Sequence, residues 1–473
     1  MNFRVARAPL VALALALLTV CGFQADRMNA EGDWQGDILL QQVNRKVAIH
    51  FTRGHEGLLG TIDIPATMSF GVPVADLHWS DSSVQFTLHS SGPDGDLRFQ
   101  GQVGGGSLRG SVSGEHLRGS FEMRRCGAVQ LPHTTPLARS WKPELGSSWP
   151  VHAWLVTSPA RENLDSARLS VAERHIAHDL PEVRSLVIVR HGRIAFERYF
   201  RGATRNEATN VKSVTKSFTS ALIGIALREH VLGNLDQTVA EFLPEYFGPA
   251  TDTHKRKITL RHLLTMTAGF EWIENGPSTF AWHRSPDFAK FAIDLPLAVE
   301  PGQTGRYNTS LSHLLSIILT RKSGLSAREF AEKYLFGPVG IRVQGWGQDP
   351  QGYTMGGIDL YLTPRDMARF GLLYLNLGLW KDRQVVPAAW VRESMAPAFV
   401  RDPLLHNYGY LWWLVRDDDL PAFAAIGYGG QLIYVCPKLD LVVAMTSTTV
   451  DPHNDVLEFV RRYITPAVKS GPS

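Results

Sequence analysis

The sequence Ser213-Val214-Thr215-Lys216 places a hydroxyl and an amine three positions apart, and apolar residues at helical spacing then predict a helix over residues 217–228. Side chains three apart on a helix project from one face, about one turn apart. A serine there becomes a nucleophile if the amine takes its proton. Burial disfavours the charged amine, and a helix N-terminus favours negative charge on the serine. The alternative is a capping serine beside a solvated lysine, because one such spacing also arises by chance.

Two later stretches follow in an order that favours the catalytic interpretation. The first is Pro301-Gly302-Gln303-Thr304-Gly305-Arg306-Tyr307-Asn308-Thr309. The second is Gly427-Tyr428-Gly429-Gly430-Gln431, which comes directly before a β-rich run. For Tyr307, the structural alternative is an aromatic side chain that packs beside the Pro-Gly turn.

The chain around these stretches predicts an α+β domain over residues 151–467, because long amphipathic stretches alternate with short apolar runs. Residues 186–197 predict a hairpin around His191-Gly192, and residues 431–445 predict a second hairpin. Helices are expected over residues 311–319 and from the cap Thr363 to about Tyr374.

The residues before this domain have a different hydropathy pattern. Residues 31–126 hold short runs of alternating apolar and polar residues, separated by turn signals about every ten residues, and predict about seven or eight strands. Such a pattern favours a small antiparallel barrel or sandwich, with an accessory or spacer role. His50 and His89 are isolated on these strands, and we interpret both as surface or hydrogen-bonded histidines. Residues 127–150 carry four prolines and little periodicity, which indicates a stiff linker.

The first 22 residues have the order of a secretory signal, with Arg4 and Arg7 ahead of an apolar run that ends at Val20. Leu18-Thr19-Val20-Cys21 resembles a bacterial lipobox, but Val20 stands where such boxes have a small residue, so a lipid anchor at Cys21 stays open. No later stretch reaches about 18 uninterrupted apolar residues. We therefore expect a periplasmic or secreted protein whose mature chain has no transmembrane helix.

Composition and cysteine count exclude several classes of protein. The 473 residues are 44% hydrophobic, and 48 Lys+Arg against 45 Asp+Glu give a net charge of +3 without a basic block, so we expect no nucleic-acid partner. Cys21, Cys126 and Cys436 fit no zinc-ligand spacing, and we expect neither a metal nor a cofactor. Cys126 and Cys436 fall in different predicted domains, which favours two free thiols.

The order Ser-x-x-Lys, Tyr-x-Asn and Lys/His-x-Gly is the three-motif plan of the penicillin-recognising serine hydrolases, and residues 154–464 resemble that family. Its members include class C β-lactamases, low-molecular-weight penicillin-binding peptidases, and related esterases and aminohexanoate-oligomer hydrolases. Residues 258–269 and 362–371 look typical of its class C-like branch. The resemblance implies a β-lactamase/transpeptidase-like fold, an antiparallel sheet flanked by helices plus an all-helical region, here preceded by the small barrel.

Carried over by position, the resemblance implies that Ser213 is the acylated nucleophile, Lys216 its hydrogen-bonded partner and Tyr307 the phenol that shuttles a proton. A phenol with a pKa near 10 in water needs a lowered pKa for that role, which we expect from a nearby Lys216. The backbone N–H groups of Ser213 and Gln431 would form the oxyanion hole.

Two departures from the family pattern bear on the substrate-binding candidates Asn308, Thr309, Tyr428, Gly429 and Gly430. The family's asparagine falls at Thr309, with Asn308 one place early, so a hydrogen bond to a substrate amide is either lost or made by a shifted side chain. Tyr428 replaces the lysine or histidine that helps to hold a substrate carboxylate, and a neutral phenol supplies no such charge. Gly429 and Gly430 keep the backbone accessible.

The leading hypothesis is an exported serine hydrolase that acts through an acyl-enzyme on a small ester or amide. One alternative is a β-lactamase or D-Ala-D-Ala carboxypeptidase with a peptide-like substrate. The other is a non-catalytic cell-wall binding or sensing protein on the same scaffold, which the altered second and third motifs favour.

Overall fold

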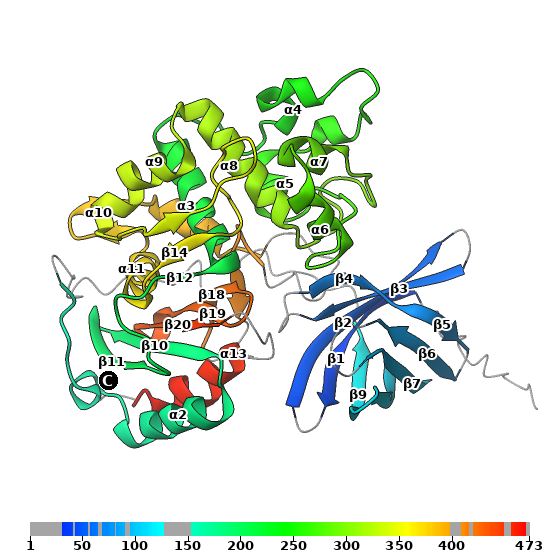
Figure 1. The fold of residues 1–473 in the computed structure, drawn as a ribbon, viewed down its shortest axis with the longest axis horizontal. Coiled ribbons are helices and arrows are strands. Elements are labelled where there is room, and N and C mark those ends of the chain that lie inside the picture. Colours follow the sequence, from blue (N-terminus) through cyan, green and yellow to red (C-terminus); the bar gives the residue numbers. More distant parts are fainter. Residues whose placement is uncertain are drawn as a thin grey trace, which may run out of the picture.

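The computed structural model contains two parts of different architecture, drawn as ribbons in Figure 1. It describes residues 31–40, 43–54, 57–64, 69–80, 82–89, 95–126, 153–397, 408–415, 420–448 and 456–469. The predicted signal segment 1–22, with Cys21, and the predicted linker 127–150 lie outside these described residues. Within those ranges, no helix has the length and apolar character needed to cross a bilayer.

The first part is one antiparallel sheet that curls into a nearly closed barrel, as the sequence predicts (Figure 1). Its strand order is β4-β3-β2-β1-β9-β8-β7-β6-β5. The bounds are β1 Gly32–Leu40, β2 Val43–Gly54, β3 Gly57–Ile64, β4 Ser69–Pro73, β5 Ala75–Trp79, β6 Ser83–Leu88, β7 Leu97–Gly104, β8 Ser107–Ser113 and β9 Arg118–Arg125. These nine strands exceed the expected seven or eight, because β4 and β5 are too short to carry a countable alternation.

The barrel is filled by every second residue of its strands. Val47, Ile49 and Phe51 on β2 join one buried cluster, and His50 between them points to the opposite face. There, His50 Nδ1 lies 2.9 Å from Asp33 Oδ1, and its Nε2 lies 3.2 Å from Asp63 Oδ2. The interpretation of His50 as a hydrogen-bonded histidine is therefore confirmed.

The second part is built on a six-stranded antiparallel sheet with the order β11-β10-β20-β19-β18-β17. Its bounds are β10 Val183–Arg190, β11 Arg193–Tyr199, β17 Trp413–Val415, β18 Ala422–Gly427, β19 Gln431–Cys436 and β20 Leu441–Ser447. Both predicted hairpins are confirmed. Strand β20 pairs with β10, although the two lie near opposite ends of the domain's sequence.

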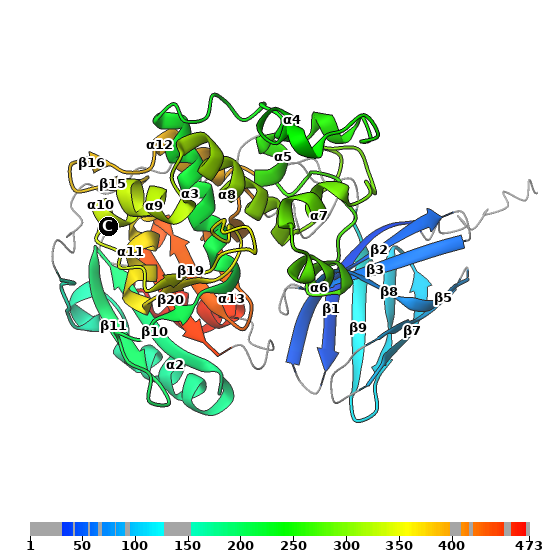
Figure 2. The same cartoon turned by 45° about the horizontal axis from the view of Figure 1, so that its top comes forward.

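Helices cover both faces of this sheet (Figures 1 and 2). One face packs on α2 (Ser166–Asp179) and α13 (Val456–Phe459), and the other packs on α11 (Pro364–Leu375) and α3 (Thr215–Arg228). The remaining helices are α4 Val239–Phe242, α5 Leu260–Leu264, α6 Pro277–Arg284, α7 Phe288–Asp294, α8 Thr309–Ser323, α9 Ala327–Ala331, α10 Gly337–Val339 and α12 Ala388–Ser394. Short strands complete the part: β12 Thr209–Asn210, β13 Gly345–Trp346, β14 Leu360–Leu362, β15 Leu379–Trp380 and β16 Arg383–Gln384.

The predicted helices occur close to their expected bounds. The helix expected over residues 217–228 is α3, which begins two residues earlier, directly after a 3₁₀ turn at Lys212–Val214. The helix after Thr363 is α11, and the Thr363 hydroxyl accepts the hydrogen bond of the Asp366 backbone N–H as a cap does. Within the described residues, Cys126 and Cys436 are not joined by a disulfide, as expected.

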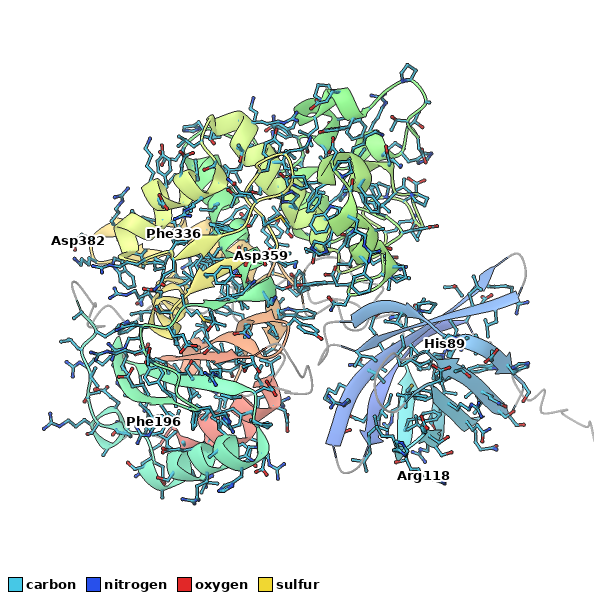
Figure 3. The ribbon with its side chains drawn as sticks, in the orientation of Figure 1. His89, Arg118, Phe196, Phe336, Asp359 and Asp382 are labelled. Atoms are coloured by element: carbon cyan, nitrogen blue, oxygen red, sulfur yellow. The ribbon has the colours of Figure 1, made fainter. Side chains whose placement is uncertain are left out.

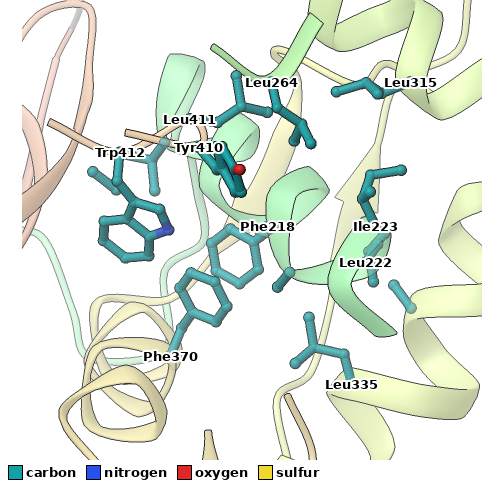
Figure 4. Close-up of a cluster of buried hydrophobic side chains, with 14 of the residues drawn as sticks. Phe218, Leu222, Ile223, Leu264, Leu315, Leu335, Phe370, Tyr410, Leu411 and Trp412 are labelled. Carbon is teal, nitrogen blue, oxygen red and sulfur yellow. The ribbon is translucent and has the colours of Figure 1, made fainter. Parts of the chain in front are cut away.

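An aromatic stack packs Phe218 of helix α3 against α11 (Figure 4). The ring of Phe218 lies 3.7 Å, centroid to centroid, from that of Phe370 on α11, and Phe370 in turn stacks on Trp412 at 5.8 Å. All three side chains are buried. Because Phe218 follows Lys216 by two residues, this packing fixes the helix that carries the lysine.

We predict that Phe218→Ala lowers the free energy of unfolding by about 3–5 kcal/mol, because it opens a cavity in this stack. Urea unfolding, monitored by tryptophan fluorescence, measures the change. Phe280→Ala on α6 is the matched control, since the Phe280 side chain is 57% exposed and should cost less than about 0.5 kcal/mol. Equal losses in the two variants would contradict the stack's structural role.

Candidate active site

Ser213 lies in a strained turn immediately before α3. Lys212, the residue ahead of it, has φ of 52°, in the left-handed region that non-glycine residues rarely adopt. Asn210 Oδ1 accepts the Lys212 backbone N–H at 2.9 Å, and the Thr215 hydroxyl donates to the Lys212 carbonyl at 2.6 Å. Two side chains thus hold the turn that presents the half-buried Ser213.

A second segment, which carries none of the predicted motifs, supports this turn. Asp359, labelled in Figure 3, accepts a hydrogen bond from Asn210 Nδ2 at 2.7 Å, and the Val211 backbone N–H donates to the Leu360 carbonyl at 2.8 Å. A Cβ at Gly357 would lie 2.4 Å from the Ser312 hydroxyl, so only glycine lets this segment lie so close to α8. The close approach places the Gly357 carbonyl beside Lys216.

Lys216 is buried, with 1% of its surface exposed, and its amine contacts three oxygen atoms. Its Nζ lies 2.9 Å from Ser213 Oγ, 2.9 Å from Thr309 Oγ1 and 3.1 Å from the Gly357 carbonyl oxygen. Burial lowers the pKa of Lys216 to about 8, and the charge of Glu274 partly opposes that shift. A substantial fraction of the amine is therefore neutral, and able to take a proton from Ser213, near pH 8.

Tyr307 lies beside the same amine, as the motif order predicts. The Lys216 Nζ is 4.9 Å from the centre of the Tyr307 ring, which also stacks on Trp413 and meets Tyr408 edge-on. The expectation of a lowered phenol pKa is wrong, because burial, reinforced by Tyr408 and Glu274, raises the pKa of Tyr307 well above its usual value. The neighbouring Ser213 hydroxyl lowers the pKa of Tyr307 but does not reverse the shift. The phenol is thus protonated at rest, and the amine is the better base.

Glu274, which the sequence analysis did not single out, belongs to the same cluster. Its carboxylate is 5% exposed and accepts hydrogen bonds from Trp272 Nε1 at 2.6 Å, the Thr309 backbone N–H at 2.9 Å and the Thr309 hydroxyl at 2.5 Å. A glutamate in the loop before α6 has no distinguishing pattern in the sequence. Only the fold brings it to the start of α8.

Asn308 and Thr309 take different places in the structure. Asn308 caps α8, and its Oδ1 accepts both the backbone N–H of Ser310 at 2.8 Å and the Ser310 hydroxyl at 2.6 Å. Thr309 instead contacts Lys216 and Glu274 through its hydroxyl. The structure therefore brings Thr309 into the cluster and commits the Asn308 side-chain oxygen to the cap.

The third motif lies against the nucleophile turn. A Cβ at Gly427, the last residue of β18, would lie 2.3 Å from the Val211 carbonyl oxygen and 3.1 Å from Lys212 Cβ, so strand and turn are in direct contact. Gly429 and Gly430 have φ of 81° and 98°, which glycine adopts without strain. They lead to Gln431, whose side-chain amide makes two hydrogen bonds to the Ser447 backbone. Its Nε2 donates to the Ser447 carbonyl at 2.6 Å, and its Oε1 accepts from the Ser447 N–H at 3.1 Å. Tyr428 is half-buried at the same turn.

We predict that Lys216→Met removes a specific pH dependence of stability. The unfolded lysine keeps its proton up to about pH 10.4, whereas the folded one has a pKa of about 8. The unfolded state thus binds more protons between these values, and this residue makes the wild type more stable as pH rises, by up to about 3 kcal/mol.

Unfolding in urea at pH 7, 8, 9 and 10 measures the stability of the wild type relative to Lys216→Met. Groups common to both proteins cancel in the difference. The difference should grow in favour of the wild type with rising pH, and a constant difference would show that Lys216 titrates in the folded state as it does in water.

Two proteins of similar sequence are named as a hydrolase and as an esterase. The chain is 24% identical over 293 residues to the 6-aminohexanoate-dimer hydrolase of Paenarthrobacter ureafaciens, covering 57% of this chain and 73% of that protein. It is 24% identical over 213 residues to the esterase EstB of Burkholderia gladioli, covering 40% of this chain and 54% of that one.

Solved structures show that the fold is shared. A putative 6-aminohexanoate-dimer hydrolase from Bacillus anthracis superimposes with a TM-score of 0.55 at 22% identity, over 68% of this chain and 89% of that one. The family model described as Beta-lactamase matches residues 172–463, which include Ser213, Lys216, Tyr307 and the third motif. The chain therefore belongs to the beta-lactamase family, as the three motifs predict.

Proposed function

We propose that the protein is an exported serine hydrolase that forms an acyl-enzyme at Ser213 and cleaves a small ester or amide. The observation that carries the proposal is the 2.9 Å contact between the Ser213 hydroxyl and the buried Lys216 amine. The relatives named as a hydrolase of aminohexanoate dimers and as an esterase support this class of reaction. The signal-like order of residues 1–22 supports export.

Each step can be assigned to a group of the site. The neutral Lys216 amine takes the Ser213 proton while Oγ bonds to the substrate carbonyl carbon, and the resulting oxyanion is stabilised by the backbone N–H groups of Ser213 and Gln431. The bond between the carbonyl carbon and the leaving oxygen or nitrogen breaks as that atom takes a proton from the Tyr307 hydroxyl. The Lys216 ammonium then gives a proton to the Tyr307 oxygen. Water then attacks the acyl-enzyme carbonyl carbon and gives a proton to the Lys216 amine. The bond between that carbon and Ser213 Oγ breaks, the ammonium returns the proton to Oγ, and the acid leaves.

In this scheme Tyr307 is a proton donor rather than a resting base. Its raised pKa suits that role, because a phenol that stays protonated at neutral pH can deliver its proton to a leaving group. The low pKa of Lys216 assigns the complementary step, removal of the serine proton, to the amine.

Intact-mass spectrometry with a panel of nitrophenyl esters, anilides and a cephalosporin tests the proposal. We expect an acyl adduct on Ser213 with a short-chain ester or anilide, and none in Ser213→Ala. A stable adduct or turnover with the cephalosporin alone would support the β-lactamase alternative. Absence of any adduct across the panel would contradict the proposal and favour the non-catalytic alternative.

The identity of residue 428 bears on the choice between neutral and carboxylated substrates. We predict that Tyr428→Lys raises kcat/KM for a carboxylated cephalosporin about 10- to 100-fold relative to a neutral ester, because a charge-assisted hydrogen bond contributes about 1.5–3 kcal/mol. Steady-state kinetics with both substrates measure the ratio. The isosteric control Tyr428→Phe adds no charge and should leave it within about threefold, and an unchanged ratio in Tyr428→Lys would remove residue 428 as a determinant of charge preference.

A further inference from the structure

Two of the three contacts of the Lys216 amine have fixed directions, and one of these depends on Glu274. A carboxylate only accepts hydrogen bonds, so the Thr309 hydroxyl 2.5 Å from Glu274 Oε1 must donate its hydrogen to that oxygen. Its oxygen is then left to accept from Lys216 Nζ at 2.9 Å. The Gly357 carbonyl, 3.1 Å from Nζ, also accepts only.

This arrangement decides where the lone pair of the neutral amine points. A neutral amine has two hydrogens and one lone pair, and both hydrogens are required by Thr309 and the Gly357 carbonyl. The lone pair therefore faces the third neighbour, Ser213 Oγ, at 2.9 Å. That is the orientation in which the amine can take the serine proton.

We propose that Glu274 is a positioning residue that, through the Thr309 hydroxyl, aims the lone pair of Lys216 at Ser213. The inference rests on the proposed function, in which Lys216 is the base that activates Ser213. Glu274 touches neither Ser213 nor the amine in this arrangement, and it acts by fixing the direction of one hydroxyl.

The surroundings of Glu274 fit this role. Its other oxygen accepts two fixed donors, the Trp272 indole at 2.6 Å and the Thr309 backbone N–H at 2.9 Å, so the carboxylate has one orientation. Glu274 as a whole residue is also only 5% exposed, so its charge is little screened by water. Trp272 is itself buried and meets Trp282 edge-on, which fixes the indole donor.

The charge of Glu274 has a second effect on the same amine. Facing Lys216 are the Ser213 hydroxyl, the Thr309 hydroxyl, the Gly357 carbonyl and the Tyr307 ring, with Tyr408 beyond that ring, and none of these carries a charge at neutral pH. Glu274 raises the pKa of Lys216 against the larger lowering by burial. Loss of that charge therefore lowers the pKa of the amine.

Glu274→Gln changes direction and charge together while it keeps the shape of the side chain. The amide oxygen can accept from Trp272 and the Thr309 backbone, but its NH₂ group then faces the Thr309 hydroxyl and donates to it. The hydroxyl hydrogen turns to the next acceptor, the lone pair of Lys216. We expect the acylation rate constant to fall about 10- to 100-fold at its optimal pH, with KM for the ester changed less than about threefold.

A titration followed by NMR of lysine side-chain nitrogen tests the inference without reliance on catalysis. The Lys216 signal is assigned by its absence in Lys216→Met. Glu274→Gln should lower the titration midpoint by at least half a pH unit, whereas Glu197→Gln should not. Glu197 is the control because its carboxylate is largely shielded from water but is paired with Arg365.

A double-mutant cycle tests whether Glu274 acts on Lys216 through the Thr309 hydroxyl. Thr309→Val removes the hydroxyl and should slow acylation to a similar extent, and Glu274→Gln should then cost less than about threefold more in the Thr309→Val background. Independent, multiplying losses would overturn the role assigned to the hydroxyl. If Glu274→Gln does not fold, Thr309→Val alone carries the rate and NMR tests.

The inference and the proposed function fail in different ways. A wild type that forms no acyl adduct contradicts the proposed function, while the NMR midpoints still test Glu274. A wild type that acylates, with Glu274→Gln matching it in rate and midpoint, overturns the inference and leaves the serine hydrolase intact.

Discussion

The proposed chemistry depends on the burial of one amine, that of Lys216, away from water. Lys216 can act on Ser213 only because burial disfavours its charged form, and burial is tolerable because three oxygens satisfy the amine. Those oxygens come from three separate segments of the chain. The site therefore exists only when α3, the start of α8 and the segment around Gly357 are packed together.

Several features of the fold serve that packing. The stack of Phe218 on Phe370 ties α3 to α11, which lies on the sheet. Gly357 lets a loop lie against α8, and Gly427 lets a strand end lie on the turn that carries Ser213. The same packing that excludes water from the Lys216 amine also buries Tyr307. Burial raises the pKa of Tyr307 and lowers that of Lys216. Burial thus shifts the two pKa values in opposite directions, which suits the proposed roles of Lys216 as base and Tyr307 as proton donor.

Local patterns predicted a large part of this arrangement. Period-two alternation predicted the barrel, helical spacing predicted α3 and α8, and the capping residues at Thr363 predicted α11. The order of three motifs predicted that Ser213, Lys216 and Tyr307 meet. The predicted direction of the Tyr307 pKa shift is wrong, because the prediction considers the charge of Lys216 but not the burial of the phenol, which is the larger effect. Glu274 was missed since a lone carboxylate looks like a surface residue until the fold places Thr309 and Trp272 against it. Outside such motifs, a contact between residues distant in the chain has no recognisable pattern in a single sequence.

The central claim is that Ser213 is activated by a neutral Lys216. The most direct measurement is the rate at which a fluorophosphonate modifies Ser213 as a function of pH, followed by mass spectrometry in the wild type and in Lys216→Met. The account predicts a rate that rises with pH through a midpoint near the Lys216 pKa of about 8 and nearly vanishes in the variant. A rate independent of pH between 6 and 9, or equal in both proteins, would contradict it.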